Sequence, residues 1–472
     1  MRRESSEVRR GRAFAAGAGL LAGVAAGAAL LALASVAVAH RLTRIADADP
    51  GALIEAAHVP PLLTADAEPV ELRYDVYCAA PGPDPESGAP CDAAGTVHVR
   101  RGQSGPFQSI ALKLDPNASH DRYVAEVPEA VASSEEGFSY YAVLRNVRTG
   151  AETSLPAGGE AAPQRSFPLG HSVAVALGGH SFGFVRRADA RVASARWGAG
   201  HEDVGLEEGP LTAPIGATSF DVEASGAVAV LDEAKHRMLR FRAGKVVGTV
   251  PLEITGTLAD MSVGPDGTIY VLETAGQGPD STPLLRSFQP NGHSKASWQA
   301  AERTVSAVRM GPDGPVTLEY PAAQWMPAED HGGVLQRKTQ EQQGRPGRPL
   351  PGGDDVVVLR TGKEVRVALV GSEGVSRSWR VESETPIAEV QLAEPLGNRL
   401  LLVFRVYTDT HDEFVALVLD GKGLVERFSL ESADWAESAP ISRFRLAGSS
   451  LYQLGSTPTG MFVDRFDLEV RP

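Results

Sequence analysis

Charged side chains recur at matching positions of several short apolar segments between residues 219 and 446. When these segments are aligned on their last apolar residue, one position holds Asp221, Ser262, Arg309, Gln391 and Arg445. A position two residues earlier holds Ser219, Asp260, Ala307, Glu389 and Arg443. Residues two apart in a strand share a face, so these side chains would gather on one side. The candidate ligand-binding residues are Asp221, Asp260, Arg309, Glu389, Gln391, Arg443 and Arg445.

The mixture of three carboxylates and three arginines limits the chemistry of this set. A hard cation prefers oxygen ligands without competing guanidinium groups, so the sequence predicts no metal site and no cofactor. Two interpretations remain. The ring either neutralises its own charges as part of the structure, or it lets Arg309, Arg443 or Arg445 hold a small polar or carboxylate ligand through the guanidinium fork.

Other stretches with reactive side chains point to structure. Residues 409–413 concentrate potential metal ligands, but they join two predicted strands, 400–407 and 414–419, and are expected to form an exposed turn. The chain contains no HExxH zinc helix and no phosphate-binding loop. Cys78 and Cys91 flank a loop rich in Pro and Gly, and they are predicted to form a disulfide. A pair with this spacing lacks the CxxC pattern of redox and metal sites.

The segments that carry the charged residues form a repeat. Residues 220–226, 261–267 and 308–314 match one another, each with an apolar strand followed by a turn that contains glycine. The turn glycines, at 226, 267, 314, 353, 397 and 448, are 41, 47, 39, 44 and 51 residues apart. A four-stranded propeller blade needs about this length. The spacing predicts an all-β fold with a six-bladed β-propeller over 166–472, and it leaves a seven-bladed count open.

The first repeat unit carries a more specific resemblance. A Gly-rich turn at 197–200, the segment 214–216, the strand 220–222, Gly226 and the hairpin 230–241 together resemble an NHL repeat. Lys235 stands where that family has Asn in its "D-x-x-N-H-R-I" hairpin. The first two repeat units keep the residues of the NHL pattern, whereas the other four resemble it only in the spacing of their turn glycines. The layout as a whole resembles that of a family of exported bacterial proteins, and this resemblance implies no activity.

The ends of the repeat region predict how the propeller closes. The last unit supplies three strands, 442–446, 450–454 and 461–470, where a blade needs four. The missing outer strand is predicted at 190–196, directly before the first complete unit. This arrangement would join the two ends of the propeller in one blade.

Residues 70–165 predict a smaller β domain. The stretch 70–77 alternates apolar and polar residues, and similar short runs follow at 96–99, 110–114, 123–127 and 138–144. This spacing is typical of a β-sandwich. The segment 137–144 and the turn at 148–150 resemble an immunoglobulin-like or fibronectin type III domain.

The N-terminal region predicts export. Residues 13–39 contain no charge and are long enough to cross a bilayer as a helix. Five arginines in the basic segment 1–12 precede this run, which favours a cytoplasmic N-terminus. The run is predicted to be a transmembrane signal anchor, with a signal peptide cleaved after Ala39 as the alternative. Residues 40–69, with four prolines, are predicted to be a linker.

The location follows from this reading. The bulk of the chain would lie outside the cytoplasm, periplasmic or at the cell surface, and would be secreted if the chain is cleaved after Ala39. Residues 13–39 would make the membrane the first partner.

Composition excludes several functions. The chain has 472 residues, 43% of them hydrophobic, and a net charge of -14, which excludes a disordered chain and a general nucleic-acid binder. The expected function is a membrane-tethered, extracytoplasmic binding or scaffold protein whose propeller binds a protein, a glycan or a small polar ligand. The alternative is a propeller-type lyase or hydrolase that acts on an exported substrate.

Overall fold

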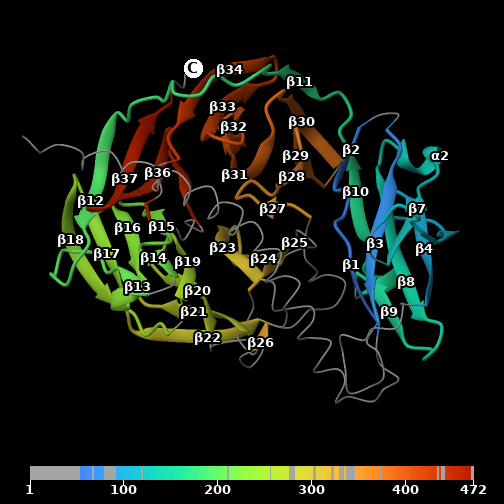
Figure 1. Cartoon of the computed structure of the whole chain (residues 1–472), viewed down its shortest axis with the longest axis horizontal. Helices are drawn as coiled ribbons and strands as arrows, with labels where there is room; N and C mark the ends of the chain where they lie inside the picture. Colours follow the sequence, from blue (N-terminus) through green and yellow to red (C-terminus); the bar gives the residue numbers. More distant parts are fainter. Residues whose placement is uncertain are drawn as a thin grey trace, which may run out of the picture.

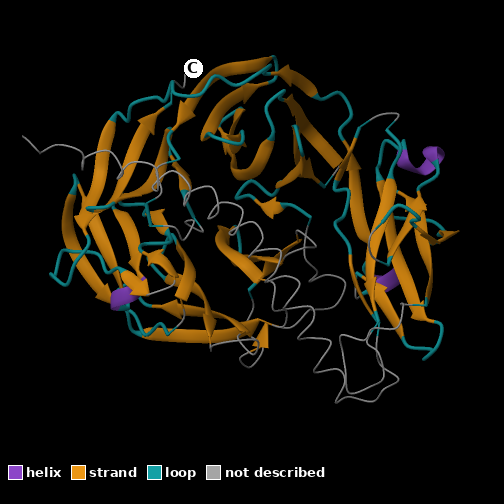
Figure 2. Cartoon of the chain, viewed as in Figure 1, coloured by secondary structure: helices purple, strands orange, loops and turns teal. Residues whose placement is uncertain are grey.

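The computed structural model describes residues 54–468 as an all-β molecule with two parts, drawn in Figures 1 and 2. Within this range the description leaves out 66–67, 79–91, 119–120, 157, 210–211, 256, 276–281, 301–304, 320–323, 329–333, 336–345, 373, 433–434 and 437–441. In Figure 2 helices are confined to short turns, while strands make up both parts. The predicted all-β class is confirmed.

The first part is a sandwich of two sheets. One sheet has the strand order β1 (Glu55–Ala57), β3 (Glu71–Tyr77), β7 (Arg122–Glu126) and β6 (Lys113–Leu114). The other has the order β2 (Leu63–Thr64), β10 (Gln164–Pro168), β8 (Phe138–Asn146), β4 (Ala93–Arg101) and β5 (Gln108–Ala111), and β9 (Glu152–Leu155) also pairs with β8. Alternating residues of both sheets, such as Leu72, Val97 and Tyr140, are fully buried in a shared core. The alternation read from the sequence therefore marks the buried faces.

The strands of the sandwich extend beyond the predicted domain limits. β1 and β2 lie inside 40–69, which the sequence assigned to a linker, and β10 runs past residue 165. The proline content was misleading because Pro60 and Pro61 lie between β1 and β2, where no ladder hydrogen bond is needed from their nitrogens.

The second part is a β-propeller. Six antiparallel sheets follow one another around a common centre in Figure 1. Blade 1 contains β15 (Phe220–Val222), β16 (Val228–Asp232), β17 (Arg237–Arg242) and β18 (Lys245–Pro251), and blade 2 contains β19 (Thr257–Val263), β20 (Ile269–Ala275), β21 (Thr282–Phe288) and β22 (Ser294–Ala300). Blade 3 contains β23 (Val305–Gly311), β24 (Gly314–Glu319) and β25 (Gln324–Pro327), and blade 4 contains β28 (Asp355–Thr361), β29 (Glu364–Gly371) and β30 (Gly374–Glu382). Blade 5 contains β31 (Ile387–Leu396), β32 (Arg399–Tyr407), β33 (Asp412–Asp420) and β34 (Gly423–Leu430), and blade 6 contains β35 (Phe444–Ala447), β36 (Ser450–Thr457) and β37 (Gly460–Asp467). Apolar clusters fill the spaces between blades 1 and 2, 4 and 5, 5 and 6, and 6 and 1.

The predicted closure is confirmed. Strand β12 (Ala190–Arg196) pairs antiparallel with β37 and becomes the outer strand of blade 6. Buried Ala193 joins an apolar cluster that also contains Phe220 and Leu239 of blade 1 and Met461 of blade 6. The first and last blades therefore share one core.

Residues 173–196 form a strap along the outside of the last three blades, visible along the upper edge of Figure 1. β11 (Val173–Ala176) pairs in parallel with β30 and gives blade 4 its outer strand. Val185 then forms a parallel bridge to Ser429 of blade 5, and β12 completes blade 6. A second parallel addition occurs at blade 2, where β26 (Val334–Leu335) pairs with β22.

The sandwich is docked on blade 4. Leu63 and Phe167 of the sandwich pack with Val357 and Ala368 of blade 4 in one buried cluster. The buried Arg366 guanidinium donates to the Leu63 carbonyl at 3.2 Å and lies 2.7 Å from the Glu68 carboxylate. This contact fixes the sandwich against the propeller.

Two predictions concern residues outside the described range. The predicted membrane span 13–39 lies there, and no helix in the described part of the chain is long and apolar enough to cross a membrane. Cys91 is also not among the described residues, so the disulfide between Cys78 and Cys91 stays a prediction.

Candidate functional site

Four of the predicted ring residues meet at the centre of the propeller. Asp221 belongs to β15, Asp260 to β19, Arg309 to β23 and Arg445 to β35, the innermost strands of blades 1, 2, 3 and 6. Alignment on the last apolar residue works for these strands because each is short and leads directly into the hairpin of its blade. We name these four residues the channel network.

Asp260 is the hub of the channel network. Its side chain is 1% exposed, and its two oxygens accept four hydrogen bonds from three other blades. Oδ1 accepts from Ser219 Oγ at 2.8 Å and from Ser442 Oγ at 2.5 Å, whereas Oδ2 accepts from the Val308 amide at 2.9 Å and from Arg309 Nη1 at 2.6 Å. A single carboxylate therefore ties blades 1, 2, 3 and 6 together.

The surroundings keep Asp260 ionised. Burial by itself raises the pKa of this carboxyl group, but the charges of Arg309 and Arg445 and the hydrogen bonds from Ser442 and Val308 outweigh burial and lower it. Hydrogen bonds that are donated to the charged form have this effect. A carboxylate with four donors and a lowered pKa is a poor general base, because protonation would break contacts that hold four blades.

Asp221 forms a smaller contact beside the hub. Its Oδ2 atom accepts from the Val263 amide at 2.8 Å and from Ser262 Oγ at 3.1 Å, both in blade 2. Its Oδ1 atom lies 3.5 Å from Arg445 Nε. The Asp221 side chain is 16% exposed and the Arg309 side chain is 20% exposed, so solvent reaches the channel network at these two residues.

Arg445 is the buried cation of the network. Its Nη2 atom donates to the Met261 carbonyl at 2.9 Å and lies 4.0 Å from Asp260. Burial and the neighbouring Arg309 charge lower its pKa to about 10, although Asp221, Asp260 and Glu394 act in the opposite direction. The group stays charged at neutral pH. Its buried Nη1 atom has no hydrogen-bond acceptor among the described residues.

The other three predicted ring residues lie elsewhere. Arg443 is buried with its guanidinium 5.0 Å from the Phe414 ring of blade 5. Glu389 is 46% exposed and lies 3.9 Å from Arg405. No hydrogen bond joins Gln391 to the channel network among the described residues. β31 contains two register shifts, at 387–389 and 390–392, which alter the alternation of its side chains. Alignment with the other inner strands therefore does not group Glu389 and Gln391 with the channel network.

Glu394 is the blade 5 residue that the sequence analysis missed. It is one of the charges that act on Arg445, and it pairs with Arg348 at 2.5 Å. Counting back three residues from the turn glycines gives Glu394 from Gly397 and Arg445 from Gly448. Alignment of blades 5 and 6 on these glycines would have found it, although in blades 1 and 3 Asp221 and Arg309 lie five residues before the glycine.

The acidic stretch 409–413 anchors the strap. Glu413 is buried, and its carboxylate accepts from the Gly183 amide at 2.5 Å and contacts His180 Nε2 at 2.8 Å. The predicted exposed turn is confirmed for Asp409 and His411 but is wrong for Glu413, which faces the strap. No group of three metal-ligating side chains occurs among the described residues.

Residues 179–183 match the pattern Gly-x-Ser-x-Gly, yet the strap does not form a nucleophile elbow. An elbow requires a strand that turns sharply into a helix, and no helix follows in this part of the chain. The neighbouring His180 ring already contacts Glu413 through Nε2 and Arg427 through Nδ1. Among the described residues, no His, Asp or Glu side chain is hydrogen-bonded to Ser181.

The hairpin that resembles an NHL repeat has a structural role. Asp232 is buried, accepts from the Gly205 amide at 2.9 Å and pairs with Arg237 at 2.8 Å. Lys235, in place of the usual Asn, donates to the carbonyls of Gly200 and Asp203. These side chains hold the loop 198–205 against blade 1.

Comparisons with known proteins add no family. No family model and no curated protein matches the chain. Virginiamycin B lyase from Staphylococcus aureus has 10% identity and a TM-score of 0.32, with 52% of this chain and 94% of the other covered. The C-terminal WD40 domain of Sif2 has 11% identity and a TM-score of 0.27, with 88% and 98% covered. Similarity this low carries no argument, so the β-propeller class rests on the arrangement of the sheets.

Proposed function

We propose that the protein is an extracytoplasmic binding module, tethered to the membrane by residues 13–39, whose six-bladed propeller binds a small carboxylate ligand in its channel. The observation that carries the proposal is the Nη1 atom of Arg445, a buried donor without an acceptor among the described residues. A buried polar group without a partner is costly. A ligand oxygen placed there would remove that cost.

The charges of the channel support an anionic ligand. Asp260 has all its donors in place, and Glu394 is paired with Arg348. Asp221 lies on the Nε side of Arg445, so neither oxygen of this carboxylate reaches Nη1. An arginine binds a carboxylate through a planar fork, and Arg309 adds a second positive charge nearby.

The sandwich supports a tethered arrangement. Its two sheets have the strand orders β1-β3-β7-β6 and β10-β8-β4-β5, which correspond to the A-B-E-D and G-F-C order of immunoglobulin-like domains. We infer an immunoglobulin-like domain that follows the anchor. Because this domain is docked on blade 4 through a buried cluster, it would act as a rigid base for the propeller.

An enzymatic function has less support. A lyase or hydrolase needs a group that accepts a proton, and the channel carboxylate with the deepest burial, Asp260, is saturated with donors and has a lowered pKa. Binding accounts for the buried Arg445 Nη1 donor, which no described residue pairs, without such a group.

Titration calorimetry on the full-length protein in detergent tests the proposal. Acetate, succinate and galacturonate are the probes, with chloride at the same ionic strength as reference. We expect at least one carboxylate to bind more tightly than chloride. Arg445→Gln should abolish this binding, and Arg405→Gln, which changes an exposed arginine of blade 5, should preserve it. Equal affinity for all anions, or binding that survives Arg445→Gln, would refute the channel site.

A further inference from the structure

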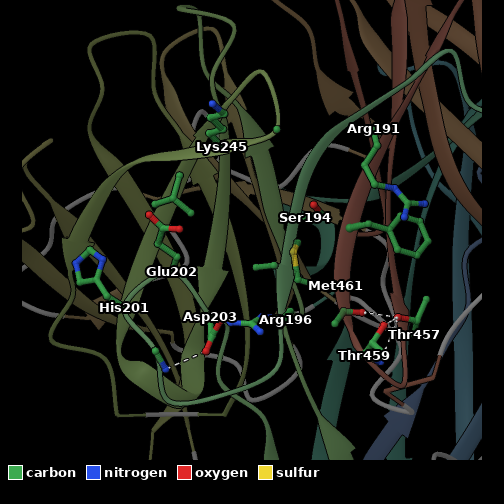
Figure 3. Close-up of a pocket in the computed structure, with 16 residues that line it drawn as sticks. Arg191, Ser194, Arg196, His201, Glu202, Asp203, Lys245, Thr457, Thr459 and Met461 are labelled. Atoms are coloured by element: carbon green, nitrogen blue, oxygen red, sulfur yellow. Dashed lines mark hydrogen bonds and ion pairs between the residues drawn. The ribbon is translucent and has the colours of Figure 1, made fainter.

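A groove of about 860 Å³ lies on the outside of the propeller, where blade 6 meets blade 1 (Figure 3). This volume is within the range of ligand sites. Figure 3 shows Ser194 of β12 near the middle of the groove, with Glu202 and Lys245 on one side and Thr457 and Thr459 on the other. The groove is far from the channel network in the fold, because β12 is the outermost strand of its blade.

The backbone of Ser194 faces this groove. The Trp197 amide donates to the Thr459 carbonyl, so the backbone groups of residue 197 point toward β37. The Arg196 carbonyl accepts from the Val204 amide at 2.9 Å, so residue 196 points away from β37. Backbone groups alternate along a strand, and Ser194 therefore points the same way as Arg196.

Ser194 is the open position on this edge. At one end of the groove the Val192 carbonyl accepts from the Gly244 amide at 3.1 Å, and at the other the Arg196 carbonyl is occupied by Val204. No described residue bonds the amide or carbonyl of Ser194 outside the β37 ladder. An unpaired strand edge is a template for another strand.

The chain covers the outer edges of three other blades with its own extended segments. β11 pairs with blade 4, β26 pairs with blade 2, and Val185 bridges to blade 5, each in parallel. β11 is the fourth strand of blade 4, as β12 is of blade 6. β26 and Val185 lie beyond the fourth strand of blades 2 and 5, so two blades accept an extended segment at the edge that corresponds to Ser194. The edge at Ser194 differs because a groove adjoins it and no described segment fills that groove.

We propose that the groove binds an extended, polar peptide segment of a partner protein, which pairs its backbone with Ser194 and adds a strand to blade 6. Backbone pairing of this kind is a known mode of peptide recognition. The walls favour polar side chains, since the exposed groups that line the groove include Arg191, Arg196, Glu202, Lys245, His201 and the hydroxyl of Thr459. The site is independent of ligand binding in the channel.

A peptide library and a proline substitution test this proposal. A phage-displayed library of random dodecapeptides is panned on the full-length protein, and the synthetic peptide selected is titrated by fluorescence anisotropy. Ser194→Pro removes the outward N–H without removing a ladder donor, because Pro is tolerated on a strand edge. We expect the affinity to fall by more than about tenfold, since a hydrogen bond is lost and the ring blocks the approach. Ser194→Ala, which keeps the backbone, should bind as the wild type does.

A second measurement keeps the test decisive if Ser194→Pro disturbs the fold. In the wild-type protein, hydrogen exchange of the Ser194 amide should slow when the selected peptide is added, while the amides of β18 and β34 should not change. The proposal is overturned if panning yields no binder, if the peptide binds Ser194→Pro with wild-type affinity in a folded protein, or if exchange at Ser194 is unaffected by a bound peptide.

Discussion

The propeller uses two similar acidic residues, Asp260 of blade 2 and Glu389 of blade 5, in different ways. On the side of blades 1, 2, 3 and 6, Asp260 is 1% exposed and receives donors from Ser219, Val308, Arg309 and Ser442. On the side of blade 5, Glu389 is 46% exposed and 3.9 Å from its cation. The comparison teaches that residue type and repeat position do not by themselves define a site. Burial together with a complete set of partners makes Asp260 a link between blades, and Glu389 has neither.

The largest expected effect comes from removing the hub. Asp260→Ala would leave the Arg309 and Arg445 charges without their shared partner. It would also remove the acceptor of the Ser219 and Ser442 hydroxyls. We expect a loss of roughly 3–5 kcal/mol in the free energy of unfolding, as for other buried charges that lose a partner. Glu389→Ala should change it by less than about 0.5 kcal/mol. Urea unfolding followed by tryptophan fluorescence measures both, and equal losses would remove the distinction between the two sides.

Acid should weaken the hub selectively. Because the pKa of Asp260 in the folded protein is lowered, its ionised form contributes stability above the unfolded value of about 3.9, and this contribution is lost as the pH falls through the folded pKa. The stability difference between the wild type and Asp260→Asn should therefore be constant from pH 7 to about pH 5 and shrink below pH 4. If the stability difference between the two proteins stayed constant down to pH 2, the pKa of Asp260 would not be lowered in the folded protein.

The two serine donors should have intermediate effects that depend on Asp260. Ser219→Ala and Ser442→Ala each remove one hydrogen bond to a buried carboxylate, and each should cost about 1–2 kcal/mol. In a double-mutant cycle with Asp260→Ala, the cost of each serine substitution should nearly vanish. Additive losses in the cycle would show that the serines act through other contacts.

The smallest predicted effects lie on the blade 5 side and sharpen the comparison. Glu394→Gln weakens the pair with Arg348, both partly buried, and should cost about 1 kcal/mol. Gln391→Ala should be neutral within about 0.5 kcal/mol. Thermal unfolding of the two variants side by side would rank them. If Gln391→Ala were the more damaging substitution, the original alignment of blade 5 would be the better one.

The sequence predicted the parts of the propeller that have regular spacing. The closing strand at 190–196 followed from a count of strands in the last unit, and the structure pairs it with β37. Asp221, Asp260, Arg309 and Arg445 followed from alignment of strands whose final residues pair without interruption. The register shifts of β19 (257–260) and β23 (305–307) come before the paired stretch that was aligned. An alternating pattern predicts which side of a strand each residue faces, as long as no extra residue interrupts the hydrogen-bond ladder.

The missed features depend on irregular or distant pairing. Each register shift in β31 reverses the sides of the residues that follow, and no turn residue marks those positions in the sequence. β11 and β26 are four and two residues long and pair in parallel with blades far along the chain. Segments this short carry too little pattern to be recognised. Their partners are set by the tertiary fold.

A crystal structure of the protein grown with the carboxylate that binds most tightly tests the central claim. The claim is that a ligand pairs with the Arg445 Nη1 donor, which has no acceptor among the described residues, while Asp260 already has a full set of donors from the protein. We predict a carboxylate oxygen at hydrogen-bond distance, about 2.7–3.1 Å, from Arg445 Nη1. The four contacts of Asp260 should be unchanged. A ligand bound away from Arg445, or one that displaces Ser442 or Arg309 from Asp260, would contradict the account.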